Sequence, residues 1–219
     1  MPVIDNINAI RTLIPPEVTI VAVSKTRSPD EITEAYRAGL RDFGENRVQE
    51  LVAKRPLLPE DIRWHFIGHL QSNKARLVVP AATLIHSLDS IGLLNEIQKV
   101  AGKHNKVISC LLQFHIATEA TKFGMSVEEA MTLADVWKNG RYDHVKISGV
   151  MGMASFTGDQ ALITQEFRIL KSSFDLLKTR YFQTFDHFDT LSMGMTGDYL
   201  LAIREGSTMV RIGTGIFGT

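Results

Sequence analysis

A lysine ends the first strongly apolar segment of the chain. Lys25 directly follows residues 18–24 (VTIVAVS), which have the β-branched and apolar composition of a buried strand. We expect a lysine at that position to have a packed stem and a partly desolvated head, which favours the neutral amine and makes it available for a Schiff base. A solvated lysine at a strand end is the simpler alternative. Lys25 is therefore a candidate nucleophile whose role depends on its neighbours.

Two glycine-containing segments near the C-terminus offer groups that can bind an anion. Residues 191–198 (LSMGMTGD) run into a helical segment, and residues 210–215 (VRIGTG) follow it. Thr196 and Thr214 supply hydroxyl groups, and Gly213 allows a close approach of backbone amides. Such groups after the last two strands of a βα fold are typical of a phosphate site. Capping of a helix by Thr196, or by the aspartate two positions later, is the alternative.

An arginine lies inside the last apolar segment. Arg211 stands between Val210 and Ile212, so in a strand its side chain points to the face opposite theirs. A buried guanidinium needs a specific acceptor, because removing its charge from water is costly. The sequence leaves two interpretations open, an inward arginine that binds a ligand or other acceptor and an outward arginine on the surface of the strand.

Other polar segments carry weaker signals. Asn46 can present its amide to a ligand or simply start a helix, and the structural interpretation is slightly favoured. His65 and His69 lack the spacing of a metal site. His86 and Ser87 resemble fragments of a hydrolase triad, but no Gly-x-Ser-x-Gly turn accompanies them. We therefore expect neither a bound metal nor a serine hydrolase.

The elements around these residues alternate between short apolar runs and longer amphipathic segments. This alternation predicts an α/β protein with a single (β/α)₈ barrel, in which functional residues gather at the C-terminal ends of the strands. A doubly wound sheet is the second choice. An amphipathic stretch before Pro15 and Pro16 predicts an extra N-terminal helix. The predicted strands are residues 18–24, 41–44, 63–67, 83–87, 107–116, 145–151, 190–193 and 209–212, with helices near residues 28–39, 127–137, 159–180 and 198–205.

The composition is that of an ordinary globular protein. The chain has 219 residues, 44% of them hydrophobic, and its 24 Lys and Arg residues balance 24 Asp and Glu residues. No linker divides residues 1–219, so one domain is expected. The only cysteine, Cys110, lies in an apolar run and is interpreted as a buried, inert thiol, which suits a reducing compartment. We expect a cytoplasmic monomer with no nucleic-acid or membrane partner.

Five segments occur together in the order in which one known family has them. Each segment alone is unspecific, but the combination runs from about residue 18 to residue 218 and resembles the pyridoxal phosphate homeostasis protein family. The segments are VAVSK ending at Lys25, FGEN ending at Asn46, WHFIGHLQSNK ending at Lys74, LSMGMT ending at Thr196, and GSTMVRIG around Arg211.

The resemblance implies an alanine-racemase-like barrel that binds pyridoxal 5′-phosphate and contributes to vitamin B6 homeostasis and amino/keto acid balance. It implies cofactor contacts by motif position. These are Lys25 as the internal aldimine, Asn46 beside the ring, Arg211 at the pyridine nitrogen, and Thr196, Gly213 and Thr214 at the phosphate.

The chain departs from the family pattern at two places. Thr196 stands where a serine is usual, which keeps the hydroxyl group. His115-Ile116-Ala117 replaces the more common Asn-Ile-Ser before Glu119 and Lys122. None of the implied cofactor contacts comes from this second segment, so only the arrangement of that strand end is affected.

The implied partner of the ring nitrogen bears on catalysis. An arginine donates to the pyridine nitrogen but gives up no proton to it, which weakens the cofactor as an electron sink. We therefore expect a carrier or regulator of the cofactor without robust catalysis, with apo-enzymes as candidate recipients. The alternatives are a low-activity amino acid racemase that uses the cofactor, and a Schiff-base aldolase that uses Lys25 without it.

Overall fold

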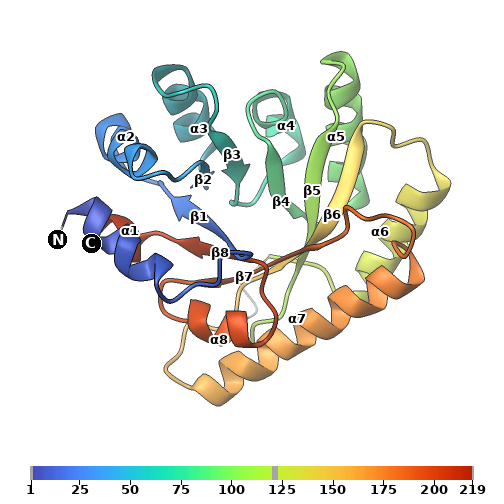
Figure 1. Ribbon diagram of the computed structural model, residues 1–219. Helices are drawn as coiled ribbons and strands as arrows, with labels where there is room; N and C mark the ends of the chain where they lie inside the picture. The colour runs from blue at the N-terminus through green and yellow to red at the C-terminus, as the bar shows by residue number, and fades with distance from the viewer. Residues whose placement is uncertain (1, 120–122, 219) are drawn as a thin grey trace.

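The computed structural model describes residues 2–119 and 123–218. Figure 1 shows the strands around a common axis with helices outside them. The strands are β1 Thr19–Val23, β2 Asp42–Glu45, β3 Arg63–Phe66, β4 Leu84–Leu88, β5 Ile108–Phe114, β6 Val145–Gly152, β7 Thr190–Met195 and β8 Met209–Ile212. The helices are α1 Val3–Arg11, α2 Pro29–Arg37, α3 Val48–Lys54, α4 Ala75–Val78, α5 Ile91–Lys103, α6 Val127–Asn139, α7 Gln160–Arg180, α8 Tyr199–Arg204 and α9 Thr214–Phe217, with short 3₁₀ helices η1 Arg55–Leu57 and η2 Ser72–Lys74.

The sheet is a closed barrel of parallel strands in the order β1 to β8. It closes because β1 pairs with β8, in a register that sets Ala22 opposite Ile212. The predicted (β/α)₈ barrel with an extra N-terminal helix is confirmed, and the doubly wound alternative is wrong because an open sheet would leave these two strands unpaired.

Two strand ends differ from the prediction by more than one residue, for local reasons. β5 stops at Phe114 instead of residue 116. Beyond it the backbone pairs with Met125, whose amide donates to the Gln113 carbonyl and whose carbonyl accepts the His115 amide. β7 continues to Met195 instead of residue 193. Gly194 makes that possible, since its φ is +94° and a Cβ there would lie 2.6 Å from the Ala202 Cβ of α8.

Helix starts follow the local signals in the chain. Ser28 caps α2 in a capping box with Glu31, and Pro29 occupies the first helical position. Ser126 and Glu129 form the same box at the start of α6. These caps place the helices directly after loops that leave the C-terminal ends of the strands.

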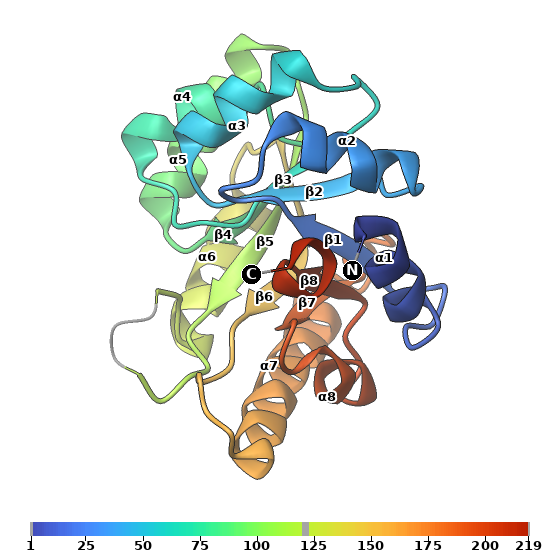
Figure 2. The same cartoon turned by 90° about the vertical axis from the view of Figure 1, so that its left-hand side faces the viewer.

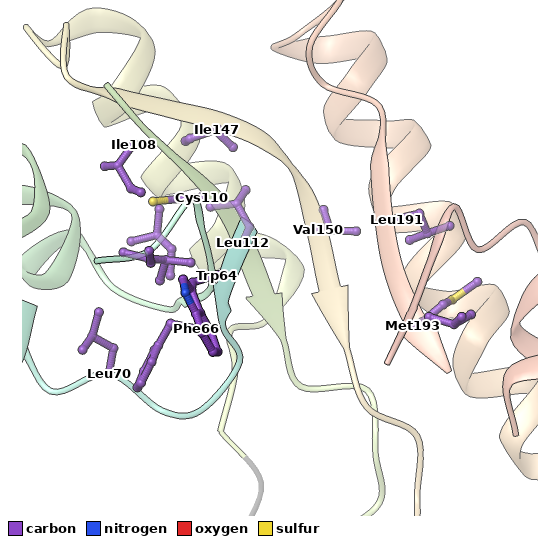
Figure 3. Packing of buried hydrophobic residues seen from close by; sticks show 14 of the residues in the cluster. Trp64, Phe66, Leu70, Ile108, Cys110, Leu112, Ile147, Val150, Leu191 and Met193 are labelled. Atoms are coloured by element: carbon purple, nitrogen blue, oxygen red, sulfur yellow. The ribbon is translucent and has the colours of Figure 1, made fainter. Parts of the chain in front are cut away.

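The core has two layers. Most buried apolar residues lie between the sheet and its helices, and Figure 3 shows Cys110 among them, near Ile108 and Trp64. Cys110 is fully buried, and burial raises the pKa of its thiol, which confirms the buried thiol. A smaller cluster fills the barrel interior, formed by Val21, Leu84, Leu111, Met151 and Met209.

The first and last helices, α1 and α9, pack against each other beside the seam between β1 and β8. Figure 2 shows α1 beside these two strands. The Asn6 side-chain amide donates to the Ile216 carbonyl at 2.9 Å, which joins α1 to α9. The helix that precedes the barrel therefore covers its closing strands. Within the described ranges, no helix has the length and apolar character needed to cross a membrane.

Candidate functional site

A pocket of about 550 Å³ opens at the C-terminal ends of β1, β6, β7 and β8. It lies at the end of the barrel where this fold carries its functional residues. Five of the six residues singled out in the sequence line it, and Asn46 does not. The lining residues are Val23, Lys25, Ser155, Phe156, Thr157, Ile163, Met195, Thr196, Gly197, Asp198, Arg211, Gly213 and Thr214.

Lys25 reaches this pocket from the end of β1, but its side chain is exposed. The expectation of a packed, partly desolvated lysine is therefore wrong for the protein as it stands. The reason is local, since β1 ends at Val23 and Lys25 lies beyond the last paired residue. No hydrogen bond or ion pair ties its amine to residues 2–119 or 123–218.

The backbone beside Lys25 is held in a rare conformation. Thr26 has a φ of +64°, in the left-handed region that residues other than glycine seldom adopt. The Thr26 amide donates to Glu50 Oε2 at 2.7 Å. A carboxylate of α3 thus stabilises the turn that follows Lys25.

A buried ion-pair network supports the same turn. The Lys54 ammonium donates to the Ser24 carbonyl at 2.8 Å, to Glu45 Oε1 at 2.9 Å and to Glu50 Oε2 at 2.8 Å. The Ser24 hydroxyl donates to Glu45 Oε1 at 2.7 Å. Burial raises the pKa of Glu45, and the bonds from Lys54 and Ser24 oppose that rise. Residues 24 and 26, on either side of Lys25, are both anchored to this network.

Arg211 points into the barrel, which decides between the two orientations that the sequence left open. It shares a face of β8 with Met209, which lies in the inner cluster. Its Nη1 donates to the Ser192 hydroxyl at 2.5 Å and its Nη2 to the Gly152 carbonyl at 2.9 Å. Burial lowers the pKa of Arg211 to about 10, against the attraction of Asp198. The guanidinium is still charged at neutral pH.

Thr196 links the two loops that the sequence identified as a phosphate site. Its Oγ1 accepts the amides of Gly213 and Gly215, each at 3.3 Å. A hydroxyl has two acceptor positions and one hydrogen, so these bonds leave the hydrogen to be donated. Asp198, rather than Thr196, stands at the N-cap of α8, and its Oδ1 accepts the Met195 amide at 2.5 Å without capping the helix.

Asn46 lies outside the pocket, although it follows β2, the strand beside β1. Its Oδ1 is buried and has no hydrogen-bond partner in the described part of the chain. Gly68 packs directly on the Asn46 backbone, because a Cβ there would lie 2.2 Å from the Asn46 carbonyl oxygen. The sequence therefore correctly predicted that Asn46 follows the second strand, but it did not predict that the residue lies outside the pocket.

The sequence missed the loop after β6. Ser155 and Thr157 line the pocket, and Phe156 lies at its rim with 96% of its side chain exposed. Glu166 of α7 fixes this loop, since its carboxylate accepts the Ser155 amide and hydroxyl, each at 2.6 Å. The only available signal was the position of these residues after the sixth strand, which carries no distinctive motif.

Four of the histidines make contacts within the described part of the chain. His69 stacks on Phe123, with ring centroids 4.0 Å apart, and pairs with Asp89 at 3.3 Å. His65 instead lies inside the barrel, where its Nδ1 faces His86 Nε2 at 2.9 Å. Of the departing segment, His115 bonds the Glu119 carbonyl at 2.9 Å, whereas Lys122 lies outside the described residues.

Comparison with known proteins gives consistent results. The family described as "Alanine racemase, N-terminal domain" matches residues 3–219. The protein of Aquifex aeolicus named pyridoxal phosphate homeostasis protein is 40% identical over 91% of this chain and 86% of that protein. The Escherichia coli K12 protein of the same name is 38% identical over 93% of this chain and 86% of that protein.

Solved structures show the same relationship. PipY of Synechococcus elongatus PCC7942 was solved without PLP (TM-score 0.92) and with PLP bound (TM-score 0.89). It is 34% identical, and each comparison covers 99% of this chain and 100% of that chain. An alanine racemase from Bartonella henselae has a TM-score of 0.72 at 15% identity, and the match covers 100% of this chain and 60% of the racemase chain. This similarity shows a shared fold.

Proposed function

Because the chain belongs to the pyridoxal phosphate homeostasis protein family, we propose that it binds pyridoxal 5′-phosphate in the pocket between β1, β7 and β8 and serves vitamin B6 homeostasis. The relatives carry this name, and PipY was solved with PLP bound. The observation on this chain that supports the proposal is the meeting of Lys25, Thr196 and Arg211 around one pocket.

The donors in the pocket match the groups of the cofactor. Lys25 is exposed at the pocket, and its amine suits the aldehyde group of the cofactor, with which an amine forms a Schiff base. The hydroxyl hydrogen of Thr196, with Gly213 and Thr214 beside it, suits the phosphate. The guanidinium of Arg211 suits the pyridine nitrogen as a donor. Asn46 does not line the pocket. We give it no direct cofactor contact in this proposal, although it follows β2, the strand that pairs with β1.

We further propose that the protein carries or regulates the cofactor without robust catalysis. Bound pyridoxal phosphate can act as an electron sink for carbanions. Arg211 stays protonated, so it donates to the ring nitrogen without giving it a proton, and the sink is weaker than one facing an aspartate. Apo-enzymes that use pyridoxal phosphate are then the recipients, and the protein acts as a monomer in amino/keto acid balance.

A visible spectrum of the purified protein tests the binding. We expect added pyridoxal phosphate to give a yellow protein whose absorption is lost in Lys25→Ala. Lys99→Ala, on the exposed side of α5, is the matched control and should keep the absorption. A colourless wild-type protein that retains no cofactor after gel filtration would contradict the proposal, and rapid racemisation of an amino acid would contradict the carrier role.

A further inference from the structure

Five buried side chains form one unbroken line of hydrogen bonds through the barrel. Arg211 Nη1 lies 2.5 Å from Ser192 Oγ, which lies 3.2 Å from His86 Nδ1. His86 Nε2 lies 2.9 Å from His65 Nδ1, and His65 Nε2 lies 3.0 Å from Asp42 Oδ1. The residues come from β8, β7, β4, β3 and β2, and none is more than 8% exposed. This line connects the floor of the pocket to the opposite end of the barrel.

The far end of the line is an anion. Arg63 donates to Asp42 from Nε at 2.7 Å and from Nη2 at 2.5 Å. Burial alone would raise the pKa of Asp42, but the hydrogen bonds from His65 and Arg63 outweigh it and lower the pKa to about 2. Asp42 is thus an acceptor at any working pH, and His65 must present an N–H at Nε2.

The direction of the remaining bonds follows step by step. If His65 is neutral with its proton on Nε2, its Nδ1 is an acceptor, so His86 donates from Nε2. His86 Nδ1 then accepts the Ser192 hydroxyl hydrogen. The Ser192 oxygen is left to accept from Arg211. Every donor on the line then has an acceptor.

The opposite direction leaves one group unsatisfied. It requires a protonated His65, which would donate at both nitrogens and make His86 donate to Ser192. The Ser192 oxygen would then accept from both His86 and Arg211, and its hydrogen would need a third partner. Among the described residues, Ser192 contacts no such partner. An unsatisfied buried hydroxyl is costly, so the first direction is favoured.

We propose that the line is a directed relay, Arg211 to Ser192 to His86 to His65 to Asp42, and that Ser192 and His86 are positioning residues for the Arg211 guanidinium. Each hydrogen bond polarises the next, which couples the charge of Arg211 to the carboxylate of Asp42 through neutral groups. Ser192 can act only as an acceptor toward Arg211, so the relay holds Nη1 in place while other N–H groups of the guanidinium face the pocket.

The same residues include a serine, two histidines and an aspartate, which suggests a hydrolase relay. Ser192 is fully buried and does not line the pocket, so a substrate does not reach its oxygen. Its oxygen also accepts a bond from Arg211, which withdraws electron density from a would-be nucleophile. The arrangement therefore serves to place a cation and not to activate a serine.

Nitrogen-15 spectroscopy of histidine side chains tests the relay directly in the full chain, with and without added pyridoxal phosphate. We expect His65 and His86 both to carry their proton on Nε2 and to have an unprotonated Nδ1. Signals are assigned from their loss in His65→Gln and His86→Gln. A proton on His86 Nδ1, or a doubly protonated His65 at pH 7, would overturn the relay whether or not the cofactor binds.

Variants test the positioning role, which depends on the proposed cofactor site. Ser192→Ala and His86→Leu should each weaken retention of pyridoxal phosphate about tenfold in equilibrium dialysis, because the guanidinium loses its fixed acceptor. His86→Gln keeps a donor and an acceptor and should recover much of this loss. Ser87→Ala is the matched control, since Ser87 is a neighbouring buried hydroxyl of β4 with no partner among the described residues.

The outcomes separate the two proposals. Wild-type retention with equal affinity in Ser192→Ala and Ser87→Ala would overturn the positioning role and leave cofactor binding intact. Failure of the wild type to bind the cofactor would overturn the proposed function, whereas the histidine spectra without cofactor would still decide the direction of the relay.

Discussion

The hydroxyl of Thr196 has two tasks that its bonds separate. Its oxygen accepts two amides of the loop after β8, which holds that loop to the end of β7. Its hydrogen remains for a ligand. The residue thus joins the two loops and is also a candidate ligand contact, and both tasks need only the hydroxyl group that serine and threonine share.

Thr196→Val should weaken retention of pyridoxal phosphate by about ten- to a hundredfold, because a hydrogen bond to a charged group contributes about 1.5–3 kcal/mol. Thr196→Ser keeps the hydroxyl and should stay near wild type. Equilibrium dialysis measures the affinity, and thermal unfolding without cofactor shows how much of the effect comes from the loop. Equal affinities for the valine and serine variants would show that Thr196 only joins the two loops.

At the scale of elements, α3 determines the geometry at the end of β1. Lys54, in its last turn, bonds both Glu45 and Glu50. Glu45 is fully buried, so its carboxylate depends on this ammonium for its charge balance. The turn that presents Lys25 therefore depends on a helix about thirty residues further along the chain.

Lys54→Met should destabilise the protein by about 3–5 kcal/mol at neutral pH, because it leaves a buried carboxylate without its partner. The pKa of Glu45, already raised by burial, should rise further. A carboxyl whose pKa is higher in the folded state than in the unfolded state makes the folded protein less stable as pH rises. The destabilisation by Lys54→Met should therefore be larger at pH 8 than at pH 5. Urea unfolding at both pH values measures it.

Lys99→Met is the control for this change, since Lys99 lies on an exposed helix face and should cost little. A Lys54→Met variant with an equal loss at both pH values would show that Glu45 is not the group responsible.

At the scale of the whole molecule, charge is distributed along the barrel axis. A buried cation, Arg211, lies at the pocket end and a buried anion, Asp42, at the other. Apolar side chains of the inner cluster fill the rest of the interior. The hydrogen-bonded line of polar side chains thus crosses a core that would otherwise be filled with apolar side chains. We expect the stability of the folded protein to depend on the charge of Asp42.

Asp42 should make the protein sensitive to acid. Its pKa is lowered from an ordinary 3.8 to about 2, which corresponds to about 2 kcal/mol of stability. A depressed carboxyl pKa contributes stability above the unfolded value and loses it as pH falls, so the contribution should disappear between pH 3.8 and about 2. Asp42→Asn should remove this part of the acid transition in urea unfolding at a series of pH values.

Asp175→Asn, at an exposed ion pair of α7, should leave the shape of that pH curve unchanged. A wild-type curve with the same shape as that of Asp42→Asn would show that Asp42 carries no such contribution.

Local sequence determined the elements and five of the residues that line the pocket. Short apolar runs and capping residues such as Ser28 depend only on neighbours in the chain, so the eight strands and their order were predictable. Once the strand count predicted a barrel, Lys25, Thr196 and Arg211 were expected at one end, because the C-terminal ends of parallel strands meet there.

Only the tertiary structure decided which way Arg211 points, where Asn46 lies relative to the pocket, and that His65 and His86 join Ser192. Alternation along a strand defines two faces but not which one is inside, and that choice is made when β8 pairs with β1. The relay likewise joins side chains that lie far apart in the sequence, from Asp42 of β2 to Arg211 of β8. Their contacts arise from closure of the barrel, which brings together groups that no local pattern in the sequence relates to one another.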